Sequence, residues 1–187
     1  AAILAESGIS TTGIDVDEEV IKQLKLGRTH IIEPGLDELI EKHVLNESIR
    51  LFTDYQKSDI FLIAVPTPLL SSKEPDLTYV NKVTSSLSGI LTPGNLIILE
   101  STVPVGTTLA LRDNLKKMRP DLNFEEEGEG ACIMIAHCPE RVLPGNVLHE
   151  LKYNDRVVGG INKKSSLAAA EFYKNFVKGK IYLTDSK

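Results

Sequence analysis

Two patterns of apolar residues alternate along the chain. Short apolar segments, typical of strands, are separated by stretches in which apolar residues recur every three or four positions, typical of amphipathic helices. The first pattern predicts strands at residues 11–16, 49–53, 59–66, 95–101, 132–138, 155–159 and 180–184. The second predicts helices at residues 17–26, 34–44, 76–91, 106–119, 146–151 and 165–177. This alternation predicts an α/β fold with a doubly wound, mostly parallel sheet.

Three of these segments carry more specific signals. The predicted strand at 59–66 is apolar from Ile60 to Pro66, which predicts a parallel strand buried on both faces. Asp76 is the expected N-cap of the helix that follows it. Pro34 is expected in the first turn of its helix, where a missing N–H group costs little.

The two ends of the chain have the patterns of interrupted elements. Residues 1–8 resemble the last two turns of a helix, with Gly8 as the C-cap and no start signal. Residues 180–187 have the pattern of a strand that stops. We therefore expect a fragment that is truncated at both ends.

Composition and charge exclude several classes of protein. Hydrophobic residues make up 42% of the 187 residues, which is enough for a packed core. The net charge of −5 and the lack of a basic stripe argue against a nucleic-acid partner. The apolar runs are too short to cross a bilayer, and the first residues lack a signal-peptide pattern, so we expect a cytoplasmic protein. The acidic run at residues 125–130 is expected to be a solvated loop.

Cysteine and histidine residues give no sign of a metal site. Cys132 and Cys138 lie six residues apart and are expected to be reduced thiols. The four histidines are scattered and lack the spacing of metal ligands.

The first motif with possible chemistry is Gly13-Ile14-Asp15, at the end of a predicted strand. In dinucleotide-binding βαβ units, an acidic residue at this point accepts hydrogen bonds from the adenosine ribose. Its carboxylate would favour NAD and repel the extra phosphate of NADP. An ordinary strand end or helix cap is an equally good interpretation of Asp15 alone.

Two more motifs follow buried strands. Ala64-Val65-Pro66-Thr67-Pro68 places a threonine in a proline-stiffened loop, at the sheet edge where α/β proteins bind ligands. The segment from Glu100 to Thr108 opens a helix and gathers hydroxyl and N–H groups suited to an anionic ligand. The alternatives are an ordinary turn for the first motif and helix capping by Thr107 or Thr108 for the second.

The fourth motif is Cys138-Pro139-Glu140-Arg141-Val142-Leu143-Pro144-Gly145. Arg141 has a guanidinium that can bind phosphate or carboxylate oxygens at two points. Glu140 is a candidate general base. The alternative is a structural ion pair or two exposed charges.

Together and in this order, these motifs resemble those of the UDP-glucose/GDP-mannose dehydrogenase family. Glu74-Pro75-Asp76 and Asp155-Arg156-Val157-Val158-Gly159-Gly160 also fall where that family has them, and the resemblance covers residues 1–187. It implies a Rossmann-like NAD-binding domain that lacks its first strand and glycine-rich loop, with the central and UDP-binding domains absent. The members that act on UDP-N-acetylmannosamine are the most similar.

The resemblance also implies an activity and a set of site residues. Family members oxidise the C6 alcohol of a UDP-sugar to a carboxylate with two NAD, here for surface polysaccharide biosynthesis. Asp15, Val65, Thr67, Thr102 and Thr108 would bind NAD. Arg141 and Val142 would contact the UDP-sugar substrate, and Glu140 would activate the hydrolytic water. The full-length protein would be a homodimer or a higher oligomer.

The sequence also departs from the family pattern. Glucose-specific members have a second glutamate where this chain has Pro144, which argues against UDP-glucose as the substrate. Cys132 and Cys138 do not lie in the motif of the family's cysteine nucleophile. The alternatives are UDP-glucose 6-dehydrogenase, a dehydrogenase of hydroxy acids or sugar-acid phosphates, and a non-catalytic binding or assembly module.

Overall fold

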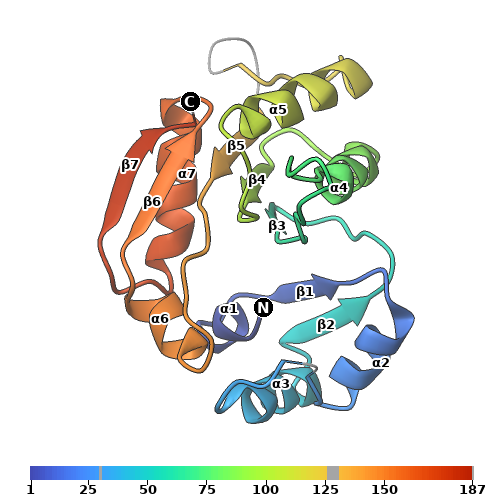
Figure 1. Cartoon of the computed structure of the whole chain (residues 1–187), viewed down its shortest axis with the longest axis vertical. Coiled ribbons are helices and arrows are strands. Elements are labelled where there is room, and N and C mark those ends of the chain that lie inside the picture. Colours follow the sequence, from blue (N-terminus) through green and yellow to red (C-terminus); the bar gives the residue numbers. More distant parts are fainter. Residues whose placement is uncertain (30, 126–130, 187) are drawn as a thin grey trace. The chain divides into compact units, whose positions relative to one another are not determined.

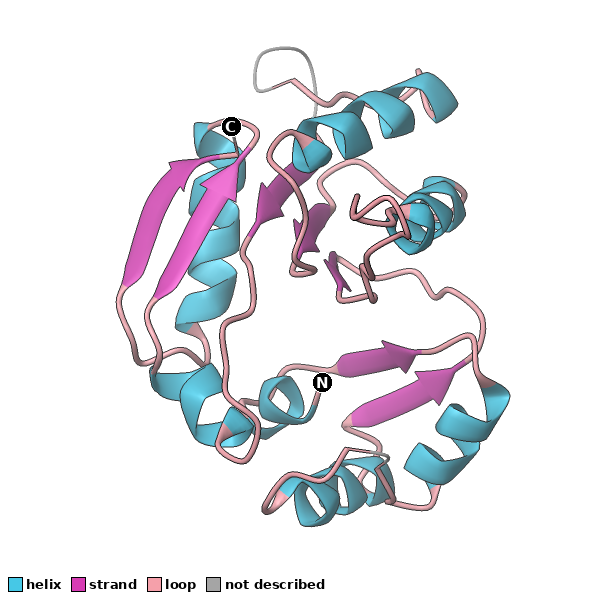
Figure 2. Cartoon of the chain, in the orientation of Figure 1, coloured by secondary structure: helices cyan, strands magenta, loops and turns pink. Residues whose placement is uncertain are grey.

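The structure is a computed structural model that describes residues 1–29, 31–125 and 131–186 (Figure 1). Strands and helices alternate along the chain as predicted (Figure 2). The helices are α1 (Ala2–Glu6), α2 (Glu18–Lys25), α3 (Leu36–Leu45), α4 (Thr78–Ser88), α5 (Thr107–Met118), α6 (Val147–Tyr153) and α7 (Lys163–Lys174). The strands are β1 (Thr11–Ile14), β2 (Ile49–Phe52), β3 (Ile60–Ile63), β4 (Leu96–Leu99), β5 (Met134–His137), β6 (Arg156–Gly160) and β7 (Ile181–Asp185). Most of the acidic run expected to be a loop lies outside the described residues.

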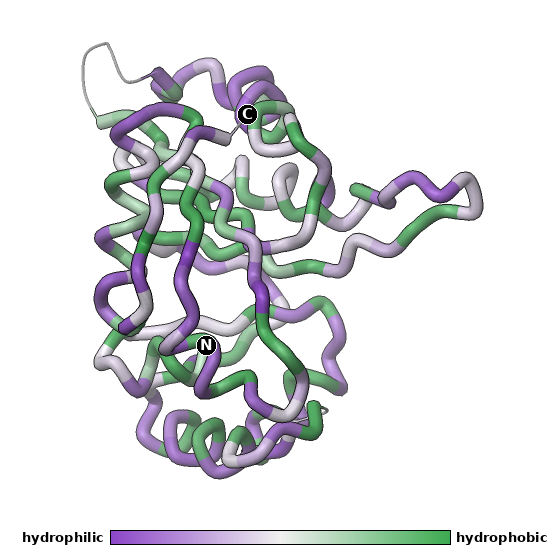
Figure 3. The backbone as a smooth tube through the Cα atoms, turned by 60° about the vertical axis from the view of Figure 1, so that its left-hand side comes forward, coloured by the Kyte–Doolittle hydropathy of each residue, from purple (hydrophilic) through white to green (hydrophobic). Residues whose placement is uncertain are grey.

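The chain forms two compact units, each built from separate segments of sequence. The first unit contains residues 1–56, 141–155 and 174–180. The second contains residues 57–140, 156–173 and 181–187. Hydrophobic and hydrophilic stretches alternate along the backbone of both (Figure 3), so each unit has apolar residues to bury.

The first unit is organised around a two-stranded parallel sheet. β1 pairs with β2 from Thr11↔Ile49 to Ile14↔Phe52. Helices α2 and α3 pack on these strands, and α1 packs on α3. The core consists of small and branched apolar side chains, which are Ala2, Ala5, Ile21, Ile40, Ile49 and Leu51.

Gly8 ends α1 as predicted. Its φ of +81° is left-handed, and the helix closes with hydrogen bonds from Gly8 N–H to Ala5 O and from Ile9 N–H to Leu4 O, both 3.0 Å. This pair of bonds is a Schellman motif, in which glycine is favoured because it has no Cβ.

The second unit has a five-stranded sheet in the order β3-β4-β5-β6-β7. All neighbouring pairs are parallel except β5 and β6, which are antiparallel. A mostly parallel sheet was predicted, and the structure confirms it. Every side chain of β4 is buried, as expected of a central parallel strand.

The prediction that the strand at 59–66 is buried on both faces was wrong. The strand is shorter, and burial alternates along it: Phe61 and Ile63 are buried, whereas Ile60 and Leu62 are only half-buried. Among the described strands β3 pairs only with β4. The face of β3 that carries Ile60 and Leu62 is therefore less covered than the face that carries Phe61 and Ile63.

Two predicted helix starts were also wrong. Helix α4 begins at Thr78 and its N-cap position is Leu77, not Asp76. The Asp76 carboxylate accepts the Thr78 N–H at 2.8 Å, and hydrogen bonding by the Thr78 side chain, followed by this backbone bond, lowers the pKa of Asp76. Helix α3 begins at Leu36, because Gly35 before it has a φ of +75° that no helical residue adopts. Pro34 therefore precedes the helix.

A glycine allows β6 and α7 to approach closely in the second unit. A Cβ on Gly160 would collide with the Ser166 backbone nitrogen and lie 2.6 Å from Asn162 O. Both obstacles are backbone atoms, which cannot rotate away.

We predict that Gly160→Ala lowers the free energy of unfolding by about 2–3 kcal/mol through this overlap. Gly89→Ala is the matched control, because its Cβ would meet nothing nearer than Ser86 O at 3.8 Å. The control should change stability by less than about 1 kcal/mol. Urea unfolding followed by circular dichroism measures both. Equal stability of the two variants would contradict the prediction.

Candidate functional site

Asp15 directly follows β1 in the first unit. Its Oδ1 accepts the Asp17 N–H at 3.0 Å. The N-cap of α2 is Asp17, which accepts the N–H groups of Glu19 at 2.9 Å and Val20 at 3.4 Å. Asp15 is therefore not the helix cap. No residue in the described ranges donates a hydrogen bond to its Oδ2, so this oxygen can accept one from a ligand.

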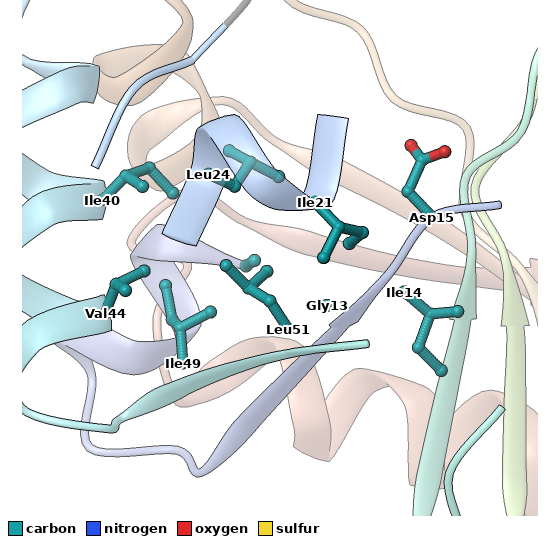
Figure 4. A pocket seen from close by; sticks show the side chains of 10 residues that line it. Gly13, Ile14, Asp15, Ile21, Leu24, Ile40, Val44, Ile49 and Leu51 are labelled. Atoms are coloured by element: carbon teal, nitrogen blue, oxygen red, sulfur yellow. The ribbon is translucent and has the colours of Figure 1, made fainter. Parts of the chain in front are cut away.

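A cavity of about 120 Å³ lies beside Asp15 (Figure 4). Its walls are mostly apolar side chains of the core, which are Ile14, Ile21, Leu24, Ile40, Val44, Ile49 and Leu51. Ligand pockets typically enclose roughly 300–1,000 Å³. The cavity is thus too small for a dinucleotide and is better described as incomplete core packing.

In the second unit, Ser101 joins the loops that follow β3 and β4. The buried Ser101 Oγ accepts the Val65 N–H at 2.9 Å and donates to Val65 O at 2.8 Å. The Thr67 hydroxyl donates to Thr102 O at 2.7 Å. Because β3 and β4 are parallel, both loops leave the sheet at its carboxyl edge. The structure thus brings Val65, Thr67 and Thr102 together.

These contacts define what Thr67 can offer a ligand. Its proton is donated to Thr102 O, so the hydroxyl can accept a hydrogen bond but has no second proton to donate. Toward a ligand, the Thr67 hydroxyl is therefore a hydrogen-bond acceptor in this arrangement.

Neither Thr107 nor Thr108 caps α5 with its side chain. The N-cap position is Gly106, and the helix has no side-chain cap. The Thr107 hydroxyl donates to Pro104 O at 2.8 Å instead. Both threonines are buried. The capping alternative is therefore wrong, and Thr108 lies in the first turn of α5.

His137 supports the same loop from β5. Its Nε2 lies 3.2 Å from Ser101 O. A carbonyl oxygen only accepts, so Nε2 carries the proton in this contact. Burial lowers the pKa of His137, and the ring is therefore neutral near pH 7.

A polar cluster in the second unit contains Glu100, which follows β4, Arg156 of β6 and Tyr173 of α7. The Tyr173 hydroxyl donates to Glu100 Oε1 at 2.6 Å, and the Arg156 guanidinium lies 5.6 Å from the Tyr173 ring centre. Burial, followed by the nearby Glu100 charge, raises the pKa of Tyr173 strongly. Burial also raises the pKa of the Cys138 thiol.

The two cysteines are buried and not bonded to each other, as predicted. A raised pKa keeps Cys138 in its thiol form, which is a poor nucleophile. The sequence also predicted no catalytic role for Cys138.

The fourth motif spans the boundary between the units. Glu140 is exposed in the second unit, whereas Arg141 is exposed and Val142 half-buried in the first. The Arg141 guanidinium forms no ion pair or hydrogen bond with the residues that the structure describes. Among the described residues, the alternative of a structural ion pair for Arg141 thus has no support, and the alternative of an exposed charge stays open.

Several contacts around the candidate site were not predicted from the sequence. Ser101 was noticed only as part of a motif, and Tyr173 and Arg156 were given no role. A polar side chain directly after the apolar run Leu96–Leu99 was the one usable signal, and it pointed to Glu100 and Ser101.

Within the described part of the chain, no three His, Cys, Asp or Glu side chains could hold a metal ion together. The same residues include no helix that is long and apolar enough to span a membrane.

The parallel sheets, the carboxylate after β1 and the joined loops after β3 and β4 define a dinucleotide-binding domain. Residues 1–177 match the profile described as "UDP-glucose/GDP-mannose dehydrogenase family, NAD binding domain". The chain belongs to this family of nucleotide-sugar dehydrogenases, and the cofactor of the domain is NAD.

Named relatives are similar over the whole chain. It is 44% identical to NDP-N-acetyl-D-galactosaminuronic acid dehydrogenase of Ralstonia nicotianae and covers 44% of that protein. It is 42% identical to UDP-N-acetyl-D-mannosamine dehydrogenase of Campylobacter jejuni and covers 46% of it. The solved UDP-D-ManNAc dehydrogenase of Pyrococcus horikoshii matches 99% of the chain with a TM-score of 0.91 and 35% identity, over 43% of its own length. The chain thus spans less than half the length of these relatives.

We predict that Ser101→Ala lowers the free energy of unfolding by about 1–3 kcal/mol, because it leaves the Val65 N–H without its partner. Ser85→Ala is the control, since that exposed hydroxyl donates only to Asn81 O within its own helix. The control should change stability by less than about 0.5 kcal/mol. Thermal unfolding compares the variants, and amide exchange at Val65 should rise only in Ser101→Ala. Unchanged exchange there would refute the assignment.

Proposed function

We propose that the chain is the NAD-binding part of a longer dehydrogenase that oxidises the C6 alcohol of UDP-N-acetylmannosamine to a carboxylate. The observation that carries this proposal is the pair of loops joined by Ser101 at the carboxyl edge of β3 and β4, in a chain of this family. The substrate rests on relatives named for that sugar, at 42–43% identity.

A second candidate substrate is a nucleotide-linked N-acetylgalactosamine derivative. The relative from Ralstonia nicotianae carries that name and is 44% identical, a difference too small to separate the two sugars. Both names contain an N-acetylated sugar, and Pro144 replaces the glutamate of the glucose-specific pattern. These two points favour an N-acetylated substrate over UDP-glucose.

The residues present fit NAD. Asp15 Oδ2 can accept a hydrogen bond from the adenosine ribose, and its charge disfavours the extra phosphate of NADP. In the proposed site Val65, Thr67, Thr102 and Thr108 contact the rest of the cofactor, with Thr67 as an acceptor. NAD, when bound, would accept one hydride from C6, and oxidation to the carboxylate would use two NAD in turn.

Substrate binding and activation of the hydrolytic water are assigned to the fourth motif, residues 138–145. Arg141 and Val142 contact the UDP-sugar, and the guanidinium pairs with its anionic oxygens. Glu140 removes a proton from the water that completes oxidation to the carboxylate. Its side chain is exposed, so water reaches it. The buried Cys138 stays protonated and takes no part.

The proposal extends to the cellular role. We place the protein in the cytoplasm, supplying an aminouronic acid for surface polysaccharide, with the full-length protein a homodimer or higher oligomer. The support is the family resemblance, together with two buried, unbonded thiols of the kind that reducing compartments preserve.

We predict that the chain binds NAD and that Asp15→Ala weakens binding roughly 10- to 150-fold, the range expected for a lost hydrogen bond to a charged group. Asp54→Ala is the control, because that exposed aspartate likewise follows a strand of the two-stranded sheet. Isothermal titration calorimetry measures both. If Asp15→Ala and Asp54→Ala bind NAD equally, Asp15 is not the ribose ligand.

We also predict that the full-length dehydrogenase reduces NAD with UDP-N-acetylmannosamine and that Glu140→Gln lowers kcat on the order of 10²–10⁴-fold. Glutamine has the same shape but is not a base. The formation of NADH follows the reaction, with UDP-N-acetylgalactosamine and UDP-glucose as comparison substrates. Turnover of UDP-glucose alone would overturn the substrate assignment, and unchanged kcat in Glu140→Gln would overturn the role of the base.

A further inference from the structure

Glu33, in the segment between α2 and α3, contacts a distant part of the first unit. Its Oε2 accepts the Gly145 N–H at 2.8 Å, and its Oε1 accepts the Val147 N–H at 2.6 Å. The partners lie 112 and 114 positions further along the chain. One carboxylate therefore holds two backbone groups at the end of the fourth motif, and the proposed function uses none of these contacts.

The two amides that donate hydrogen bonds to Glu33 lie at the start of α6. The first N–H groups of any helix lack partners within the helix. The N-cap residue Asn146 makes no side-chain cap, so the carboxylate of Glu33 takes that role from another segment. A negative charge at this end of a helix is also favourable. The contact thus fixes both the helix and the loop that leads into it.

The other end of the loop is held locally. Glu150 accepts the Leu143 N–H at 3.0 Å, and Asn154 Nδ2 donates to Arg141 O at 3.1 Å. The Leu143 backbone bond is the largest cause of a lowered pKa for Glu150. Both anchors come from α6 or its C-cap. Glu33 therefore ties the loop and the first residues of α6 to the segment before α3, whereas Lys152 ties the last turn of α6 to Glu6 of α1 through a 2.7 Å ion pair.

The segment that carries Glu33 is itself braced. Asp37 Oδ1 accepts the Thr29 N–H at 3.0 Å and the Thr29 hydroxyl at 2.7 Å, and these bonds lower the pKa of Asp37. These bonds hold Thr29 and Asp37, which lie on either side of Glu33, close to each other, and this limits how far Glu33 can move.

We propose that Glu33 is a positioning residue for the substrate loop, residues 141–147. It orients Arg141 and Val142 through the backbone without touching the sugar. The assignment of a substrate to this loop rests on the proposed function.

Amide exchange by NMR on the 187-residue chain tests the anchoring. Glu33→Ala should speed exchange of the Gly145 and Val147 amides on the order of tenfold. Glu33→Gln keeps one acceptor oxygen and should speed exchange mainly at one of the two. Glu38→Gln is the control, because Glu38 is exposed on α3. Exchange at both amides that is equal in Glu33→Ala and Glu38→Gln would overturn the proposal.

Titration with UDP-N-acetylmannosamine, followed at the Arg141 and Val142 amides, tests the positioning. The Kd should rise from the wild type to Glu33→Gln and again to Glu33→Ala, while NAD affinity and circular dichroism match those of Glu38→Gln. Faster exchange with an unchanged sugar Kd would overturn the positioning role. If the Arg141 and Val142 amides of the wild-type chain do not respond to the sugar, the proposed substrate contacts are overturned instead. The anchoring by Glu33 is then tested by amide exchange at Gly145 and Val147 alone.

Discussion

The exclusion of β4 from water is the constraint on which the second unit depends. Leu96–Leu99 are 0–3% exposed, and this requires a parallel neighbour on each side and helices on both faces. Parallel pairing sends the chain out of β3, β4 and β5 at the same edge. The loops that carry Val65, Thr102 and Glu140 therefore leave the sheet together because of a packing requirement.

Hydrogen bonds convert this proximity into a defined arrangement. Ser101 links its own loop to Val65, and His137 Nε2 holds the Ser101 carbonyl from β5. The Tyr173 hydroxyl donates a hydrogen bond to the carboxylate of Glu100, the residue before Ser101. Each contact is made by a group that is buried or half-buried, where an unpaired polar atom is costly. The apolar strand brings the loops together, and the polar groups at its end fix how they face one another.

Carboxylates in the first unit serve mainly as acceptors for backbone N–H groups. Asp17 caps α2, Asp37 closes the segment before α3, and Glu33 and Glu150 hold the loop before α6. The lowered pKa values of Asp37 and Glu150 mean that their contributions are complete above the ordinary carboxyl pKa and are lost as the pH falls through the lowered values. The hydrogen bonds of Asp17 and Asp37 use only Oδ1, as that of Asp15 does, so a spare oxygen does not distinguish Asp15 and its place directly after β1 does.

The sequence predicted the order of strands and helices because periodicity is local. It also predicted that the candidate cofactor motifs follow strands, and β1, β3 and β4 do end just before them. It overestimated the burial of β3, because an apolar run does not reveal how many neighbours a strand has. It missed the contacts of Ser101, Tyr173 and Glu33, which join residues 36, 73 and more than 110 positions apart. No spacing rule encodes such pairs.

The division of the first unit into three segments has a consequence for how the protein emerges from the ribosome. Residues 57–140, which contain β3, β4 and β5, are synthesised before α6 exists. Glu33 can therefore accept the Gly145 and Val147 N–H groups only after residues 57–140 have been synthesised. Domains usually fold in the order in which they are made. Here the part made first is completed only after three strands of the second unit have left the ribosome.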